Sequence, residues 1–352
     1  MYNIIQKRKI WLSLSAVLII ISILSLIFWG IKLGIDFTGG SLIELEFATE
    51  RPDNQQIHQQ LADLELDSLN IQPIGENGIL MRTTTLTEEK HQQILEKINN
   101  LVEPDTEPQI SEEEKQEKLK SALGLEGEGV DQLQIDLSDE DVSKLLGQED
   151  EKKSMSENFT ELRFDSIGPT IGKELQHKTI YAIIIVLFAI MGYIAYAFRK
   201  VSKPVESWKY GISAIIALGH DILLVIGIFS ILGHFLGTQI DSLFVTALLT
   251  ILGFSVHDTI VTFDRIRENL HRHQDKTFET VVNQSINETI VRSLNTSLTT
   301  LFVLTAAYIF GGATIKNFIL ALILGIIFGT YSSIFVACPF LLIFYKLKRY
   351  NK

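Results

Sequence analysis

The chain lacks several features that mark common classes of protein. It has one cysteine, Cys338, among 352 residues, so no intramolecular disulfide can form. Basic residues number 31 against 42 acidic ones, and phosphate binding needs a concentrated basic surface, so nucleic acid is a poor candidate partner. The patterns Gly-x-x-x-x-Gly-Lys-Ser/Thr, His-Glu-x-x-His and Asp-x-Asp-x-Asp-Gly are absent. We therefore expect no cofactor, no metal site and no enzymatic activity.

Long hydrophobic runs are abundant instead. The mean hydropathy is +0.22 and 46% of the residues are hydrophobic, which is unusual for a soluble chain of this size. A membrane-spanning helix needs about 20 apolar residues, and six stretches are long enough. They are residues 10–31, 179–198, 211–233, 242–262, 293–312 and 318–345. The sequence predicts a polytopic α-helical membrane protein with six transmembrane helices.

The distribution of charge predicts the orientation of these spans. Residues 32–178 contain 14 basic and 33 acidic residues, and the rest of the chain contains 17 and 9. Four basic clusters lie in alternate loops, namely residues 7–9, 199–209, 265–272 and 346–349. Because basic loops stay inside, we expect both termini in the cytoplasm and residues 32–178 outside.

The first span has two interpretations. Basic residues 7–9 precede it, as in the n-region of a signal peptide. Its apolar run is longer than the usual h-region of roughly 7–15 residues, and no Ala-x-Ala-like site follows, so we expect an uncleaved anchor. The expected division of the chain is an N-terminus with the first span (1–31), an outward domain (32–178), a five-helix bundle (179–345) and a cytoplasmic tail (346–352).

The outward domain alternates predicted strands and helices. The predicted strands are residues 34–47, which begin with a double-glycine turn, and residues 78–84 and 159–164; the predicted helices are residues 53–64, 87–101 and 169–177. Thr87 is the expected N-cap of the second helix. This interleaving predicts a small α+β domain of the ferredoxin-like type between the first two spans.

An acidic insertion at about residues 103–157 interrupts this pattern. It is dense in Glu, Asp, Gly and Lys. Such composition is typical of a solvated tether that is flexible or partly helical. Calcium binding is the alternative, but the spacing of a calcium loop is missing.

Ionisable residues inside the predicted spans are candidates for function. A charged group within a bilayer is costly, so each one calls for a role. His220 and Asp221 lie in the third span, His257 and Asp258 in the fourth, and Arg292 directly precedes the fifth.

Two spans carry a polar face. At spacings of three, four and seven residues, the fourth span has Ser255, Asp258, Thr259 and Thr262, and the fifth has Arg292, Asn295, Thr296 and Thr299. We expect both faces to look into the bundle, so that Arg292 meets Asp258. A guanidinium beside a carboxylate favours its charged form, so moving the arginine would bind or release a proton. Three alternatives stay open: a static ion pair, an interfacial Arg292, and a purely structural Asp221.

Several motifs together resemble one family, the SecF subunits of the bacterial preprotein translocase. Gly-Ile-Asp-Phe-Thr-Gly-Gly follows the first span, and Ile-Gly-Pro-Thr-Ile-Gly-Lys-Glu precedes the second. The motif glycines are Gly34, Gly39, Gly40, Gly168 and Gly172. His220-Asp221, the segment 253–259 and the segment 292–300 extend the resemblance over the spans.

The resemblance implies half of an RND-type bundle that acts with SecD beside the channel subunits SecY, SecE and SecG; YajC is a further candidate partner. It implies use of the proton gradient to export unfolded preproteins across the bacterial cytoplasmic (inner) membrane. In the family, the residues that match Asp258 and Arg292 belong to the proton-responsive site. His257 is a departure, because Asn or Asp is more usual there. The alternatives are half of an RND-type small-molecule exporter and an intramembrane protease, although Gly-x-Gly-Asp is absent.

Overall fold

The computed structural model describes residues 2–64, 66–102, 158–199 and 205–350. These residues form two compact units: a helical unit, Met1–Thr38 with Thr170–Lys352, and a sheet unit, Gly39–Pro169. The predicted acidic insertion, residues 103–157, lies outside the described residues.

The helical unit contains six spans that are long and apolar enough to cross a membrane. The first five are α1 (Arg8–Phe28), α7 (Pro169–Ala197), α8 (Ser207–Leu236), α9 (Ser242–Arg272) and α10 (Phe278–Phe310). The sixth is continuous and consists of α11 (Ala313–Ser332), the π-helical segment η3 (Ser333–Ala337) and α12 (Cys338–Tyr350). The prediction of six membrane helices is confirmed. Helix α10 begins well before the predicted residue 293, because its first turns are polar and hydropathy alone does not reveal them.

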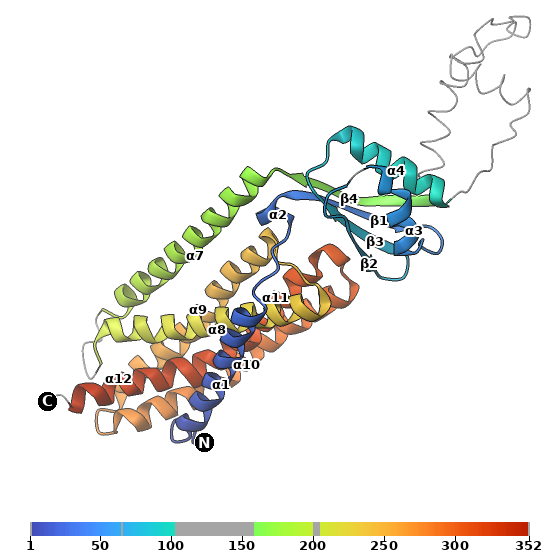
Figure 1. The fold of residues 1–352 in the computed structure, drawn as a ribbon. Helices are drawn as coiled ribbons and strands as arrows, with labels where there is room; N and C mark the ends of the chain where they lie inside the picture. Colours follow the sequence, from blue (N-terminus) through green and yellow to red (C-terminus); the bar gives the residue numbers. More distant parts are fainter. Residues whose placement is uncertain (1, 65, 103–157, 200–204, 351–352) are drawn as a thin grey trace, which may run out of the picture. The chain divides into compact units, whose positions relative to one another are not determined.

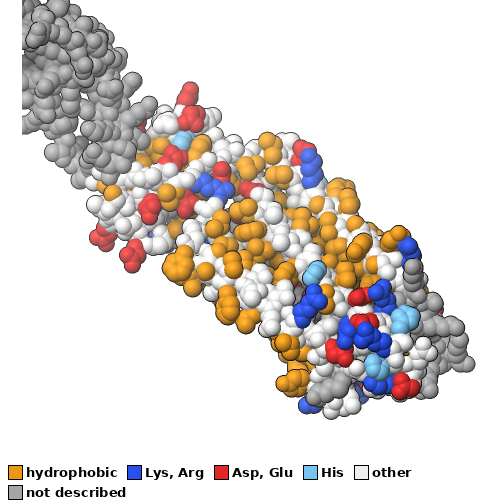
Figure 2. Space-filling view, turned by 180° about the vertical axis from the view of Figure 1, so that it is seen from behind, with side chains coloured by type: hydrophobic (Ala, Val, Ile, Leu, Met, Phe, Trp, Pro, Cys, Tyr) orange, Lys and Arg blue, Asp and Glu red, His pale blue; other side chains and the backbone are white. Residues whose placement is uncertain are grey.

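Both chain termini lie at one end of the helical unit, which we call the termini end (Figure 1). Glu279 at the start of α10 accepts ion pairs there from Arg8 at 2.9 Å and from Lys346 at 3.0 Å. Figure 2 shows hydrophobic and uncharged side chains over the middle of the visible face, with a dense group of charged side chains at the lower right and further acidic side chains at the upper left. This distribution fits a bundle whose middle lies in lipid.

Small residues bring the helices of this unit close together. A Cβ atom on Gly227 of α8 would lie 2.4 Å from the Cβ of Ser22 on α1. Gly325 and Gly329, one turn apart on α11, face α9 in the same way: a Cβ on Gly325 would lie 2.2 Å from Ile251 Cγ1. Close approach of this kind is typical of helix packing in membranes.

The sheet unit is a four-stranded antiparallel sheet with two principal helices. Its strands are β1 (Gly40–Phe47), β2 (Asn70–Ile74), β3 (Gly78–Thr83) and β4 (Phe159–Ile167), and its helices are α3 (Asn54–Gln60), the short η1 (Ala62–Leu64) and α4 (Glu88–Val102). The strand order is β2-β3-β1-β4, with β1 paired to both β3 and β4. This order and the βαββαβ succession confirm the predicted ferredoxin-like α+β fold. Strand β2 was not predicted.

The core of the sheet unit lies between β1 and the helices. Ile43, Leu45 and Phe47 alternate along β1 and are buried, as the sequence predicts. Thr87 accepts a hydrogen bond from the Lys90 amide at 3.4 Å, consistent with its expected place as the N-cap of α4.

A buried histidine of α4 adds a polar contact to this core. His91 stacks on Phe164 with 3.8 Å between ring centroids, and its Nε2 lies 3.0 Å from Glu161 Oε1. Both partners belong to β4, so this side chain joins the helix to an edge strand of the sheet.

Candidate functional site

Asp258 lies inside the helical unit and is held by hydroxyl groups. Its side chain is 9% exposed. Ser293 of α10 donates to its Oδ1, and Ser333 of η3 donates to its Oδ2 at 2.5 Å. Three helical segments therefore meet at this carboxylate.

Asp221 is the second buried carboxylate, and it is fully enclosed. Ser255 of α9 donates to its Oδ2 at 2.6 Å, and Ser332 of α11 donates to the same oxygen at 2.7 Å. His220 Nδ1 lies 3.0 Å from the other oxygen. The structure thus places Asp221 and His220 in one cluster with Ser255 of the α9 polar face.

The predicted polar face of α9 is buried as expected. Ser255, Asp258, Thr259 and Thr262 all have less than a tenth of their surface exposed. Two of the hydroxyls also bond back to the helix: Thr259 to the Ser255 carbonyl and Thr262 to the Asp258 carbonyl. Helical periodicity was sufficient to find this face.

The predicted polar face of α10 is wrong by one residue. Arg292, Asn295, Thr296 and Thr299 are exposed, whereas Thr289, Ser293 and Ser297 face the interior. Serine and threonine hydroxyls at a spacing of four residues fit between closely packed helices, where a guanidinium does not. Within the described part of the chain, Arg292 has no ion pair, and the expected meeting with Asp258 does not occur.

Hydroxyl groups on the exposed face of α10 donate hydrogen bonds to backbone carbonyls of the same helix. Thr296 donates to the Arg292 carbonyl at 3.0 Å, and Thr299 donates to the Thr296 carbonyl at 2.9 Å. His257 is likewise exposed on α9 and does not join the buried cluster. These residues leave a polar surface on the outside of the helical unit.

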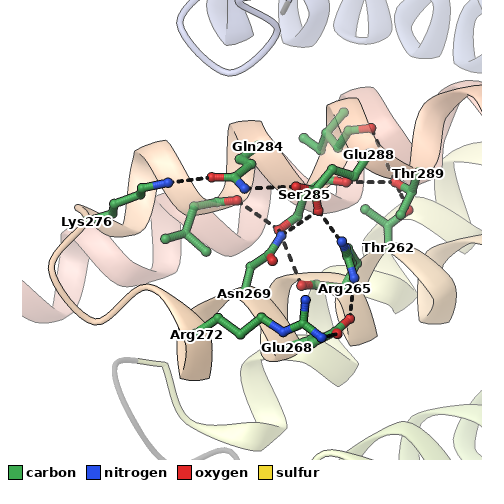
Figure 3. A network of polar contacts seen from close by, with 12 residues as sticks. Thr262, Arg265, Glu268, Asn269, Arg272, Lys276, Gln284, Ser285, Glu288 and Thr289 are labelled. Atoms are coloured by element: carbon green, nitrogen blue, oxygen red, sulfur yellow. Dashed lines mark hydrogen bonds and ion pairs between the residues drawn. The ribbon is translucent and has the colours of Figure 1, made fainter.

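A polar network continues from the buried site along α9 and α10 (Figure 3). The labelled residues are Thr262, Arg265, Glu268, Asn269, Arg272 and Lys276 from α9 and the loop after it, and Gln284, Ser285, Glu288 and Thr289 from α10. Asn269 is its centre, since its amide donates to Ser285 at 3.0 Å and to Glu288 at 2.8 Å. Arg265 pairs with Glu288, and Thr262 lies 3.5 Å from Thr289. The network fastens α9 to α10 on the side of their connecting loop.

The first glycine motif anchors the loop between α8 and α9. The Gly34 amide donates to the Ile240 carbonyl at 2.8 Å, and a Cβ atom on Gly34 would lie 3.1 Å from that oxygen. Asp36, in the short α2 (Ile35–Thr38), accepts from the Ser242 amide at 2.7 Å. Asp241 accepts from the Phe244 amide, so two carboxylates cap the N-terminus of α9.

The remaining motif glycines have different environments. Gly39 has a φ of +77°, and a Cβ there would lie 2.7 Å from Pro169 Cα, so only glycine fits. Gly40 also has a positive φ, and Gly172 is buried in α7. Around Gly168 the structure leaves open space.

Three residues of the site were not predicted: Ser293, Ser332 and Ser333. Serine is common in helices, so single serines carry little signal. Two signs were available in the sequence. One is the adjacent pair Ser332-Ser333 shortly before Cys338-Pro339, and the other is the recurrence of hydroxyl residues every four positions at Ser285, Thr289, Ser293 and Ser297. Among the described residues, no group of three His, Cys, Asp or Glu side chains is arranged to hold a metal ion.

Comparison with known proteins identifies the family. Residues 147–347 match the model of the protein export membrane protein SecD/SecF C-terminal region, and residues 25–50 match the SecD/SecF GG motif. The protein translocase subunit SecF of Thermobaculum terrenum is 41% identical over 338 residues, covering 96% of this chain and 92% of the relative. SecF of Anaerolinea thermophila is 34% identical, covering 97% and 94%.

A solved structure extends the similarity to the fold. The crystal structure of SecDF, a translocon-associated membrane protein from Thermus thermophilus, has a TM-score of 0.69 and 25% sequence identity. The match covers all of this chain but only 39% of that SecDF chain. With two family models and near-complete SecF relatives in agreement, the chain belongs to the SecF family of protein translocase subunits.

Proposed function

We propose that this chain acts with a SecD-type half to couple the proton gradient to the export of unfolded preproteins. The observation that supports this most is the environment of the Asp258 carboxylate. Its carboxylate lies within a membrane-spanning helix, and its two hydrogen-bond partners are hydroxyls. A hydroxyl can donate to a carboxylate or accept from a carboxylic acid, so the site accommodates both protonation states.

Arg292 provides the group whose approach would change the protonation of Asp258. It directly precedes Ser293, so its side chain leaves α10 about 100° away from the hydroxyl that bonds Asp258. A rotation of α10, or a swing of the long arginine side chain, would bring the guanidinium to the carboxylate. A guanidinium nearby favours the charged carboxylate, and its withdrawal removes that stabilisation. Alternation between the two arrangements would release and bind one proton.

The energy available per proton is sufficient to bias such a movement. One charge that crosses 100 mV yields about 2.3 kcal/mol. That amount changes a two-state equilibrium by nearly two decades, which is enough to favour one arrangement of α10 over the other.

The exposed polar face of α10 is where we place the SecD-type half. Arg292 and Asn295 would be costly against lipid, and the described chain leaves them uncovered. His257 of α9 is exposed as well and would be covered by the same partner. A second six-span half would bury these groups and complete the proton site.

The wider setting follows from the family and from the charged loops. We place the protein in the bacterial inner membrane with both termini in the cytoplasm and the sheet unit outside. The pathway partners would be SecY, SecE, SecG and YajC, and the translocating preprotein would be the substrate. A role in transport without enzymatic activity is in keeping with relatives that are named as translocase subunits.

Export measurements with Asp258→Asn test the proposal. Asparagine keeps the shape and the hydrogen bonds but cannot titrate. In inverted membrane vesicles we expect loss of the gradient-stimulated part of preprotein import, with normal co-purification of the SecD-type half. Asp264→Asn is the matched control, since this exposed aspartate lies on the same helix and pairs with Arg267. Gradient stimulation that survives in Asp258→Asn would reject the proposal.

A further inference from the structure

Two adjacent serines of the sixth span contact different carboxylates. Ser332 donates to Asp221 on α8, and Ser333 donates to Asp258 on α9. Both serines are fully buried. Because consecutive residues of a helix share one backbone, a displacement of the backbone at one serine also moves the other.

Ser255 provides a second link between the two carboxylates. It donates to Asp221 at 2.6 Å, and it lies three residues before Asp258 on α9. Gly329 allows this contact, since a Cβ atom there would lie 2.9 Å from the Ser255 Cβ. Asp221 therefore accepts from α9, which carries Asp258, and from the sixth span, which also donates to Asp258.

The helix changes geometry where these serines lie. The π-helical segment η3 starts at Ser333, and the Cys338 thiol donates to the Ser333 carbonyl at 3.3 Å. Pro339 has no amide hydrogen to offer the carbonyl of residue 335, and its ring crowds that carbonyl. A local π-helical turn relieves both problems, and such turns often occur at functional sites.

Other polar and ionisable groups also surround Asp221, Asp258 and the two serines. From α8 come His220 and Asp221, and from the sixth span comes Cys338. The buried face of α10 contributes the hydroxyls of Ser293 and its neighbours, and Ser15 of α1 bonds the Tyr331 hydroxyl at 3.1 Å. Within the described residues, His220 Nε2 is buried and has no hydrogen-bond partner. The cluster thus contains one imidazole and one thiol besides the two carboxylates, and the Tyr331 ring lies beside the imidazole with 6.0 Å between ring centroids.

From this arrangement we propose that Ser332 and Ser333 are positioning residues that couple Asp221 to Asp258. The inference rests on the proposed function, because it assumes that Asp258 exchanges a proton. When Asp258 changes its charge, the bond to Ser333 changes, and the junction between η3 and α11 transmits the displacement to Ser332 and Asp221. Asp221 is then part of the proton-responsive unit although it is remote from the exposed face of α10.

The test uses a variant that touches only one of the carboxylates. Ser332→Ala removes a hydrogen bond from Asp221 and none from Asp258. In the full chain, purified with its SecD-type half and placed in lipid vesicles, infrared spectroscopy follows the carboxylic-acid band that Asp258→Asn removes. We expect the titration midpoint of that band to shift by at least about half a pH unit in Ser332→Ala.

Two further variants make the result decisive. Ser297→Ala is the matched control: it removes a buried hydroxyl that bonds Thr330 and contacts neither carboxylate, so the midpoint should not move. Pro339→Ala keeps every hydroxyl but favours an ordinary α-helical turn, and the midpoint should move again. If Ser332→Ala does not assemble, Pro339→Ala decides alone.

The outcomes separate this inference from the proposed function. An Asp258 midpoint that is the same in Ser332→Ala, Pro339→Ala and Ser297→Ala would overturn the coupling, even where Asp258→Asn abolishes gradient-driven export. An Asp258 band that does not titrate at all, together with normal export by Asp258→Asn, would overturn both.

Discussion

Replacing Gly325 by alanine should weaken the contact between α9 and the sixth span. The added Cβ atom would lie 2.2 Å from Ile251 Cγ1 and 2.3 Å from its Cδ1. Ile251 is buried and its γ-branch cannot move without displacing neighbours. Overpacking of this kind costs about 1–3 kcal/mol.

A matched substitution isolates that cost. Gly253 lies on α9 with nothing within 4 Å of the position where its Cβ would stand. Both substitutions gain up to about 1 kcal/mol of helix propensity, so this contribution cancels between them. We expect Gly325→Ala to have a free energy of unfolding about 1–3 kcal/mol below that of Gly253→Ala.

Equilibrium unfolding in mixed detergent micelles measures this difference. Adding Ile251→Ala creates space, so in that background Gly325→Ala should no longer be destabilising. Equal stability of Gly325→Ala and Gly253→Ala would refute the packing argument. So would a cost that persists after Ile251 is truncated.

Three further predictions follow from other parts of the molecule. Asp36→Ala should lower the stability of the helical unit by about 1–2 kcal/mol, and Asp36→Asn by less, because the carboxylate caps α9; thermal unfolding should rank the two variants in that order. His91→Ala should destabilise the sheet unit by about 2 kcal/mol or more, through lost stacking and a lost hydrogen bond, and unchanged hydrogen exchange in that unit would contradict this. In intact cells carrying Cys338→Ala, an impermeant maleimide should modify Asp63→Cys but not Arg267→Cys, and the opposite pattern would reverse the orientation.

The two polar helices explain how far sequence reasoning could go. The face of α9 was predictable because Asp258 and its hydroxyl neighbours follow helical spacing and all lie buried. Helix α10 has two polar faces, and from the sequence we expected the one with the arginine to face the interior. Arg292 lies on the exposed face, and among the described residues it forms no ion pair. Periodicity identifies a face but does not say whether its partner is in the same chain.

Other differences have local causes. Strand β2 was missed because Pro73 and Gln72 break the alternation of apolar residues, and proline is tolerated there because β2 is an edge strand. The π-helical turn in the sixth span arises from Pro339 within a run that otherwise looks like an uninterrupted membrane helix. Hydropathy therefore predicts the span correctly but not the register change that brings Ser333 to Asp258.

Proton flux through the assembled complex tests the central claim most directly. The full chain and its SecD-type half, reconstituted with the channel in sealed vesicles that contain a pH-sensitive dye, would be given a preprotein and an imposed proton gradient. With Asp258 intact we predict a change in internal pH that accompanies translocation, and with Asp258→Asn we predict none above leakage. Translocation-linked proton flux of equal size in the two preparations would contradict the assignment of Asp258 as the proton carrier.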